Sequence, residues 1–170
     1  MKKTIFVVAL VITFGAITGG LLFNKKSKVI TNVQQTVQRA EVISKTGIHW
    51  HPQLAIYIKG QKQEIPANIG IGKQYASSKW YDPMMSMTDF HTHDSSGELH
   101  WEVMEGPVTK DHVTLKAFFE VWGKTFNANQ ILDARDRADG TVKMFVNGQP
   151  NTKFEDYQVK DKDRIEIRYE

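Results

Sequence analysis

Residues 91–102, HTHDSSGELHWE, place three histidines and two glutamates around a short polar segment. The tetrapeptide Asp94–Gly97 has the Asp, Ser and Gly composition that is typical of a turn. We therefore expect these twelve residues to form a β-hairpin, and the question is whether its histidines hold a metal ion or only make it polar.

The register of this hairpin determines which side chains meet. If Asp94–Gly97 is the loop, His93 faces Glu98 and His91 faces His100, with Cβ atoms about 4.5–5.5 Å apart on a shared face. In the alternative register, Gly97 lies in a bulge, Asp94 pairs with Glu98, and His100 turns to the opposite face. We favour the first register because it gathers the polar groups on one side.

A second histidine pair, His49 and His51, lies in the sequence HWH. Residues two apart in a strand point to the same side, so each His-x-His pair presents two adjacent imidazoles that can chelate a divalent ion. The fold must bring His49 and His51 beside the hairpin for the two pairs to act together. His112 stands alone before a predicted helix, and we expect a structural role for it.

Three imidazoles and a carboxylate suit zinc, copper, iron or manganese. The sequence thus predicts a transition-metal site, with copper or zinc favoured, whose candidate ligands are His49, His51, His91, His93, Glu98 and His100. Glu98 is a direct ligand or a base acting on a metal-bound water. A ligating imidazole usually donates its second N–H to a carboxylate or carbonyl, and the acidic residues near the hairpin that can accept it are Asp89, Asp94, Glu98 and Glu102. The alternative is a structural or pH-responsive polar cluster.

Methionines bear on the identity of the metal. Met84, Met85 and Met87 precede the hairpin, and thioethers are soft ligands that favour Cu(I). The alternative is that they fill a core gap or form an adaptable contact surface. Met104 has the pattern of ordinary packing.

The sequence from residue 46 onward predicts an α+β fold of mostly antiparallel β-hairpins with one packed amphipathic helix. Residues 54–66 predict a hairpin that turns at 59–61. Residues 115–122 carry apolar side chains at helical spacing, with Thr114 as N-cap and Gly123 as the stop. The C-terminal residues predict a strand, an Asn147–Gly148 turn, a second turn at 160–163 and a final strand.

The N-terminus differs from the rest. Residues 4–23 contain no charged side chain, which is about the length needed to cross a bilayer. We expect residues 1–23 to be a signal anchor or a cleaved signal peptide, residues 24–45 a polar or helical linker, and residues 46–170 the folded domain. Lysines flank the apolar segment on both sides and give no clear orientation. The signal-like character favours a domain outside the membrane, anchored to the lipid bilayer, or secreted after cleavage.

Composition excludes several classes of function. The chain has no cysteine, so disulfides, thiolate metal sites and cysteine nucleophiles are excluded. Residues 41–170 contain 16 Lys and Arg against 19 Asp and Glu, a net charge of −3. The high pI therefore comes from the N-terminal lysines, and no basic patch in the domain supports nucleic-acid binding.

The sequences IHWHPQLAIYIKGQKQEIPANIGI (48–71), HTHDSSGELHWE (91–102) and TLKAFFEVWGK (114–124) together resemble a small histidine-rich extracytoplasmic domain of bacterial and archaeal proteins, often membrane-tethered. The resemblance covers about residues 47–170 and implies an independent domain with a histidine site, but no reaction. Some members of that family carry a thiol-disulfide label, which this cysteine-free chain cannot satisfy. The final segment, from Val142 onward, is similar to the last strands of β-grasp domains.

Three hypotheses follow. The first is a membrane-anchored metal-binding domain for storage, delivery or sensing. The second is a non-enzymatic interaction module, with a protein partner, in which the histidines are structural. The third is a metal-dependent hydrolytic or hydrating enzyme, in which the ion would polarise a bound water.

Overall fold

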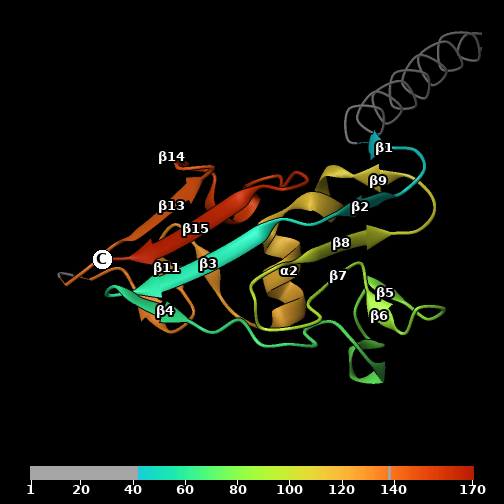
Figure 1. Ribbon diagram of the computed structural model, residues 1–170, viewed down its shortest axis with the longest axis horizontal. Helices are drawn as coiled ribbons and strands as arrows, with labels where there is room; N and C mark the ends of the chain where they lie inside the picture. The colour runs from blue at the N-terminus through green and yellow to red at the C-terminus, as the bar shows by residue number, and fades with distance from the viewer. Residues whose placement is uncertain (1–41, 138) are drawn as a thin grey trace, which may run out of the picture. The chain divides into compact units, whose positions relative to one another are not determined.

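The protein is described by a computed structural model over residues 42–137 and 139–170 (Figure 1). The predicted anchor or signal peptide and most of the predicted linker lie outside these residues. Within the two described ranges, no helix combines the length and the apolar character needed to cross a bilayer.

The end of the predicted linker is part of the fold. Val42–Ser44 form strand β1, which pairs with β9 (Val108–Thr109). These residues are therefore extended and hydrogen-bonded to the domain, where the sequence had suggested linker or helix.

The largest sheet has five strands in the order β14-β13-β15-β3-β4. Their bounds are β3 (Gln53–Ile58), β4 (Gln61–Gln63), β13 (Val142–Val146), β14 (Gln149–Pro150) and β15 (Arg164–Tyr169). Both predicted hairpins are present, β3–β4 and β13–β14, and the second turns at Asn147 and Gly148, which both have positive φ. The central pair, β3 and β15, is parallel and thus departs from the otherwise antiparallel pairing that the sequence predicts.

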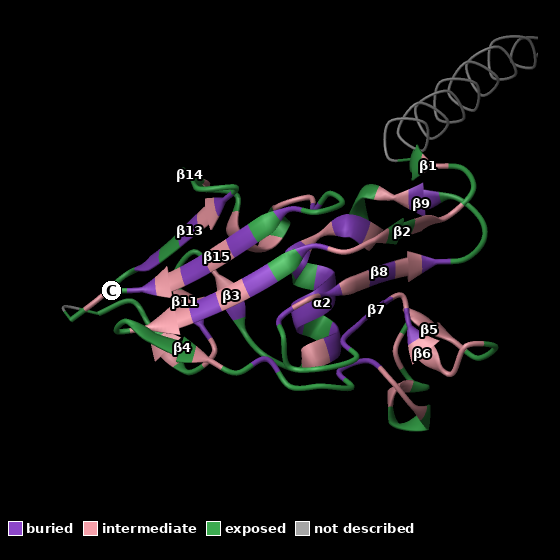
Figure 2. Ribbon diagram, in the orientation of Figure 1, coloured by how far each residue is buried: buried purple, intermediate pink, exposed green. Residues whose placement is uncertain are grey.

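Buried and more exposed residues alternate along β3, β13 and β15, so the sheet has one face toward the core and one open face (Figure 2). The side chains that the sheet buries are Leu54, Ile56, Val142, Met144, Val146, Ile165, Ile167 and Tyr169. Burial of these apolar side chains stabilises the fold, because each Å² of apolar surface removed from water contributes roughly 25 cal/mol.

The predicted helix forms as α2 (Leu115–Trp122). The Thr114 hydroxyl accepts a hydrogen bond from the Ala117 N–H, and Gly123 ends the helix in the left-handed conformation. Its apolar side faces the core, where Phe118 is fully buried between the rings of Trp101 and Trp122. The capping residues and the stripe of the sequence prediction are thus confirmed.

A second sheet carries the histidines, with its strands in the order β2-β8-β7. These are β2 (Ile48–Trp50), β7 (Phe90–His91) and β8 (His100–Val103), and all pairs are antiparallel. The chain passes from β2 into β3 through His51 and the buried Pro52 (Figure 1). The second sheet therefore adjoins the main one.

Small elements complete the fold: β5 (Tyr81–Asp82), β6 (Met87–Thr88), β10 (Phe126–Asn127), β11 (Gln130–Ile131), β12 (Ala134–Arg135) and the short 3-10 helices η1 (Lys73–Tyr75), η2 (Lys110–Val113) and η3 (Phe154–Asp156). Met84, in the β5–β6 connection, is 94% exposed, so it fills no core gap, while Met85 and Met87 are half-buried. Met104 is 63% exposed, which corrects its predicted packing role, because the chain leaves the sheet after Val103.

The aromatic core makes a prediction for stability. Phe118→Ala removes a fully buried ring and should lower the free energy of unfolding by about 3–5 kcal/mol. Lys116→Ala, at an exposed position of the same helix, is the control and should change it by about 0.5 kcal/mol or less. Urea unfolding followed by circular dichroism measures both, and equal effects would contradict the assigned core face.

Candidate metal centre

Five histidines and one glutamate gather on one face of the β2-β8-β7 sheet. His49 lies opposite Glu102 in the β2–β8 pair, and His91 lies opposite His100 in the β7–β8 pair. His51 follows His49 by two residues, just beyond the end of β2, and His93 follows His91 by two residues, just beyond the end of β7. The opposite face carries Phe90 and Trp101, which are completely buried.

The first of the two hairpin registers is therefore the observed one at His91 and His100. Beyond this pair the two chain segments separate. Thr92 pairs with residues 68–69, while Gly97–Leu99 form hydrogen bonds with Pro52 and Leu54. The predicted pair of His93 with Glu98 is absent from the described ladder, because Glu98 is opposite Gln53 instead.

This separation moves Glu98 to the rim of the cluster. Its side chain is 43% exposed, accepts a hydrogen bond from the Gln53 amide, and lies 3.5 Å from His100 Nε2. Glu102, which the sequence suggested only as a supporting carboxylate, lies opposite His49 and belongs to a potential ligand group. The signal was available, because Glu102 follows His100 by two residues in a strand and must share its face.

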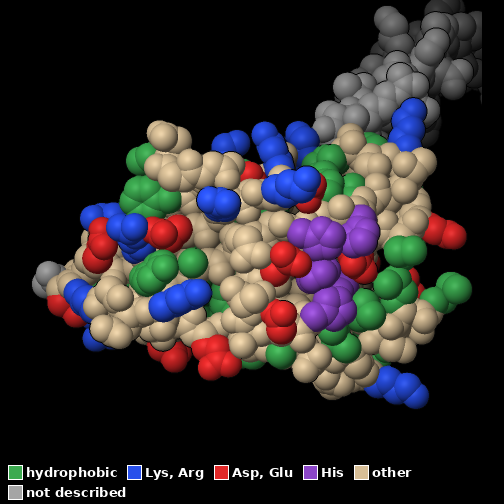
Figure 3. All heavy atoms as spheres, in the orientation of Figure 1, with side chains coloured by type: hydrophobic (Ala, Val, Ile, Leu, Met, Phe, Trp, Pro, Cys, Tyr) green, Lys and Arg blue, Asp and Glu red, His purple; other side chains and the backbone are tan. Residues whose placement is uncertain are grey.

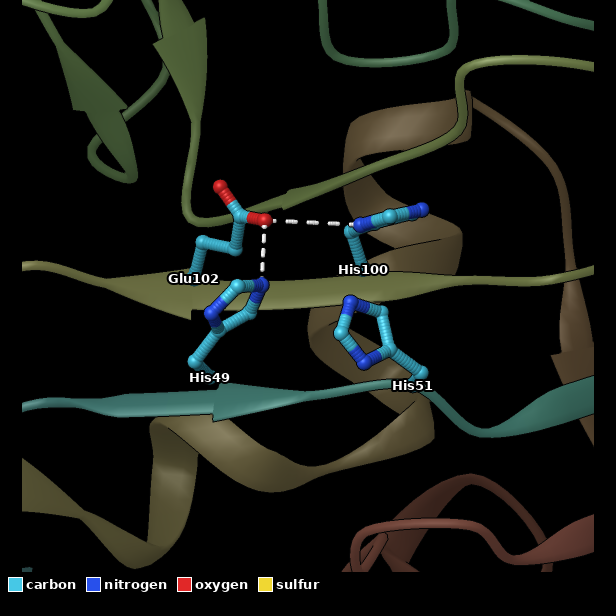
Figure 4. A group of neighbouring side chains, drawn as sticks. All are labelled: His49, His51, His100 and Glu102. Atoms are coloured by element: carbon cyan, nitrogen blue, oxygen red, sulfur yellow. Dashed lines mark hydrogen bonds and ion pairs between the residues drawn. The ribbon is translucent and has the colours of Figure 1, made fainter.

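The first potential ligand group contains His49, His51, His100 and Glu102 (Figure 4). One ligand atom from each lies within 4.8 Å of all the others. Glu102 Oε1 is 2.8 Å from His49 Nε2 and 3.4 Å from His100 Nδ1. The ring centroids of His51 and His100 are 4.7 Å apart.

The second group contains His91, His93 and His100, again with ligand atoms within 4.8 Å of one another. The His93 ring lies edge-on to both others, with centroids 4.9 Å from His91 and 4.5 Å from His100. His100 thus belongs to both groups. In the space-filling view the histidine side chains form one patch with acidic side chains beside it (Figure 3).

His91 is the most informative member. Its Nδ1 is 3.0 Å from the Thr88 carbonyl, which can only accept, so Nδ1 carries the proton and Nε2 carries a free lone pair. The side chain is 0% exposed, and Nε2 has no hydrogen-bond partner among residues 42–137 and 139–170. Burial lowers the pKa of His91 to about 4, so the imidazole is neutral at neutral pH.

His100 and Glu102 also have pKa values that favour the forms able to bind a cation, a neutral imidazole and an ionised carboxylate. Burial lowers the pKa of His100. Burial alone would raise the pKa of Glu102, but the neighbouring His91 and the hydrogen bond from His100 hold it below its usual value. Neutral imidazoles beside an ionised carboxylate are the metal-ready forms of these ligands.

His112 lies outside both groups and supports the fold. Its Nδ1 accepts a hydrogen bond from the Thr109 backbone N–H, and its carbonyl accepts one from Trp101 Nε1 at 2.7 Å. Its ring packs against Trp80, and Nε2 lies 3.7 Å from Asp89.

No protein family, curated protein or solved structure matches this chain in comparisons with known proteins. The histidine cluster is therefore the feature that points to a function.

Asp89 makes a prediction for pH dependence. Burial, and then repulsion by Asp82, raise its pKa from 3.8 to about 6. The folded state holds this proton more tightly than the unfolded chain, so the associated stability is complete below the unfolded pKa and is lost as pH rises through about 6. Asp89→Asn stays neutral, so its melting temperature should rise relative to wild type between about pH 4.5 and 7.

The matched control for this experiment is Asp139→Asn. The hydrogen bond from the Tyr169 hydroxyl lowers the pKa of Asp139, so its linkage has the opposite sign and no gain is expected at pH 7. Thermal unfolding in the presence of a chelator measures both variants. A gain for Asp89→Asn that is independent of pH would contradict the assigned titration.

Proposed function

We propose that this domain binds a transition-metal ion through the histidine cluster. The observation that carries the proposal is the lone pair of His91 Nε2, which is fully buried and unprotonated beside two further imidazoles and has no hydrogen-bond partner in the part of the chain that the structure describes. Leaving a buried polar atom unpaired costs about 1–3 kcal/mol. A bound cation would satisfy this lone pair.

We propose copper or zinc as the occupant. Imidazole suits both ions, and the cluster offers imidazole and carboxylate without a thiolate. The remaining N–H of His91 bonds to a backbone carbonyl, which is the usual outer contact of a metal-bound histidine.

We further propose that the domain works outside the membrane, tethered to the lipid bilayer through residues 4–23. The uncharged length of that segment supports the tether. Storage, delivery or sensing of a metal fits a site whose ligands range from fully buried to 65% exposed.

The architecture of the main sheet supports the suggested likeness to β-grasp domains. Hairpin β3–β4 precedes α2, the β13–β14 hairpin and β15 follow it, and the first and last strands are central and parallel. We propose that this unit is a β-grasp-like scaffold with the histidine sheet inserted beside it.

The test is metal binding by the full chain purified in detergent. We expect Zn²⁺ to bind saturably and to raise the melting temperature, because a ligand that binds only the folded state stabilises it by about 2.7 kcal/mol at 100 times its Kd. His49→Ala removes an exposed ligand with little risk to folding and should weaken Zn²⁺ binding by about 10-fold or more.

His112→Gln is the matched control, because it removes a histidine that lies outside both groups. It should leave Zn²⁺ affinity unchanged even if stability falls. Absence of saturable binding of Zn²⁺ and Cu²⁺ by the folded wild-type chain would sink the proposal and favour an interaction module with structural histidines.

A further inference from the structure

The three strands of the histidine sheet carry their ligands in a repeated pattern. Each outer strand supplies the first histidine of a His-x-His pair, His49 from β2 and His91 from β7, and the second histidine, His51 or His93, lies just beyond the end of the strand. The central strand β8 supplies His100 and Glu102 between them. This arrangement offers more ligands than a single four-coordinate ion uses.

We propose that the cluster is a two-ion centre, with one ion held by each outer histidine pair, with Glu102 of the central strand bridging the two ions and with His100 completing the ligands of one of them. This inference rests on the proposed function and specifies the number of ions and their arrangement. The two potential ligand groups, which overlap only at the central strand, are its geometric basis.

Glu102 faces both groups with different oxygen atoms. Its Oε1 lies 2.8 Å from His49 Nε2, whereas its Oε2 lies 4.0 Å from His91 Nε2. A carboxylate presented in this way can bridge two cations, and ions in two-metal sites lie about 3.5–4 Å apart. One carboxylate between two imidazole pairs also reduces the repulsion between the ions.

His100 lies between the same two groups. Its ring is stacked on His91 at 5.3 Å and is edge-on to His51 at 4.7 Å. Its Nδ1 lies 3.4 Å from Glu102, and its Nε2 lies 3.5 Å from Glu98 at the rim. Two acidic side chains therefore flank the His100 imidazole and favour the accumulation of positive charge there.

The two positions differ in access to solvent. On the β7 side His91 is 0% exposed and would hold an ion from within the protein, although His93 is exposed. On the β2 side His49 is 65% exposed and none of the four candidate ligands is fully buried. We therefore expect one slowly exchanging ion on the β7 side and one readily exchanged ion on the β2 side, as a domain that accepts and releases metal requires.

Counting ions tests the inference. The full chain in detergent is saturated with Zn²⁺, dialysed, and analysed by elemental analysis with the protein concentration determined independently. We expect two Zn²⁺ per chain, and a brief exposure to a chelator should remove one before the other. The double variant His49→Ala/His51→Ala should retain one slowly exchanging ion, and His91→Ala/His93→Ala should lose that slow phase.

A second measurement does not depend on stoichiometry. Two Cu²⁺ ions bridged by Glu102 at about 3.5–4 Å couple magnetically. The wild type should therefore show a weaker electron paramagnetic resonance signal than its copper content predicts. Glu102→Gln, which removes the bridging carboxylate, and His49→Ala/His51→Ala, which leaves one ion, should both restore the full signal per copper.

The outcomes are distinguishable. A single Zn²⁺ per wild-type chain, weakened by changes in either histidine pair, would overturn the two-ion centre and leave the proposed metal binding intact. Two ions that both persist in His49→Ala/His51→Ala would place the second ion elsewhere and also overturn it. No bound ion would overturn this inference and the proposed function together.

Discussion

The antiparallel register of β7 against β8 is the constraint on which both the core and the candidate site depend. It sets Phe90 opposite Trp101 on one face and His91 opposite His100 on the other. Because side chains alternate with a period of two, a slip of one residue would expose two buried aromatic rings and bury the imidazoles among apolar side chains. Packing of Trp101 against Phe90 and Phe118 therefore holds the histidines in place.

Two glycines allow the surrounding chain to approach this sheet. Gly70, at φ +78°, lies so close that a Cβ would be 2.4 Å from the Phe90 carbonyl, and its segment covers His91. Gly97, at φ +89°, lies equally close to the Leu54 carbonyl. Any other residue would have to push the backbone away at both places. The burial of His91 and the junction between the two sheets thus depend on positions without side chains.

Local patterns in the sequence predict the elements better than their assembly. Thr114, the apolar stripe and Gly123 predict α2 because caps and periodicity act within one segment, and Asn147–Gly148 predicts its turn for the same reason. The parallel pairing of β3 with β15 joins distant segments, and no local signal marks it. The predicted pairing of Glu98 with His93 is wrong for the same reason, since the position of Glu98 depends on Pro52–Leu54, which lie far away in the sequence.

The cluster brings together imidazole and carboxylate groups that water would hydrate separately in the unfolded chain, so forming it removes part of their hydration. His91 gives up water at Nε2 and gains no partner from the described residues, and Glu102 is partly desolvated, although the neighbouring imidazoles hold its pKa below its usual value. The unpaired nitrogen and the desolvation of both groups cost stability in the metal-free chain. They are tolerated because the strands beneath them have a well-packed aromatic core, and rigid strands hold ligands more accurately than loops do. A bound cation would return that cost, so that under the proposed function folding of the sheet and occupation of the site would stabilise each other.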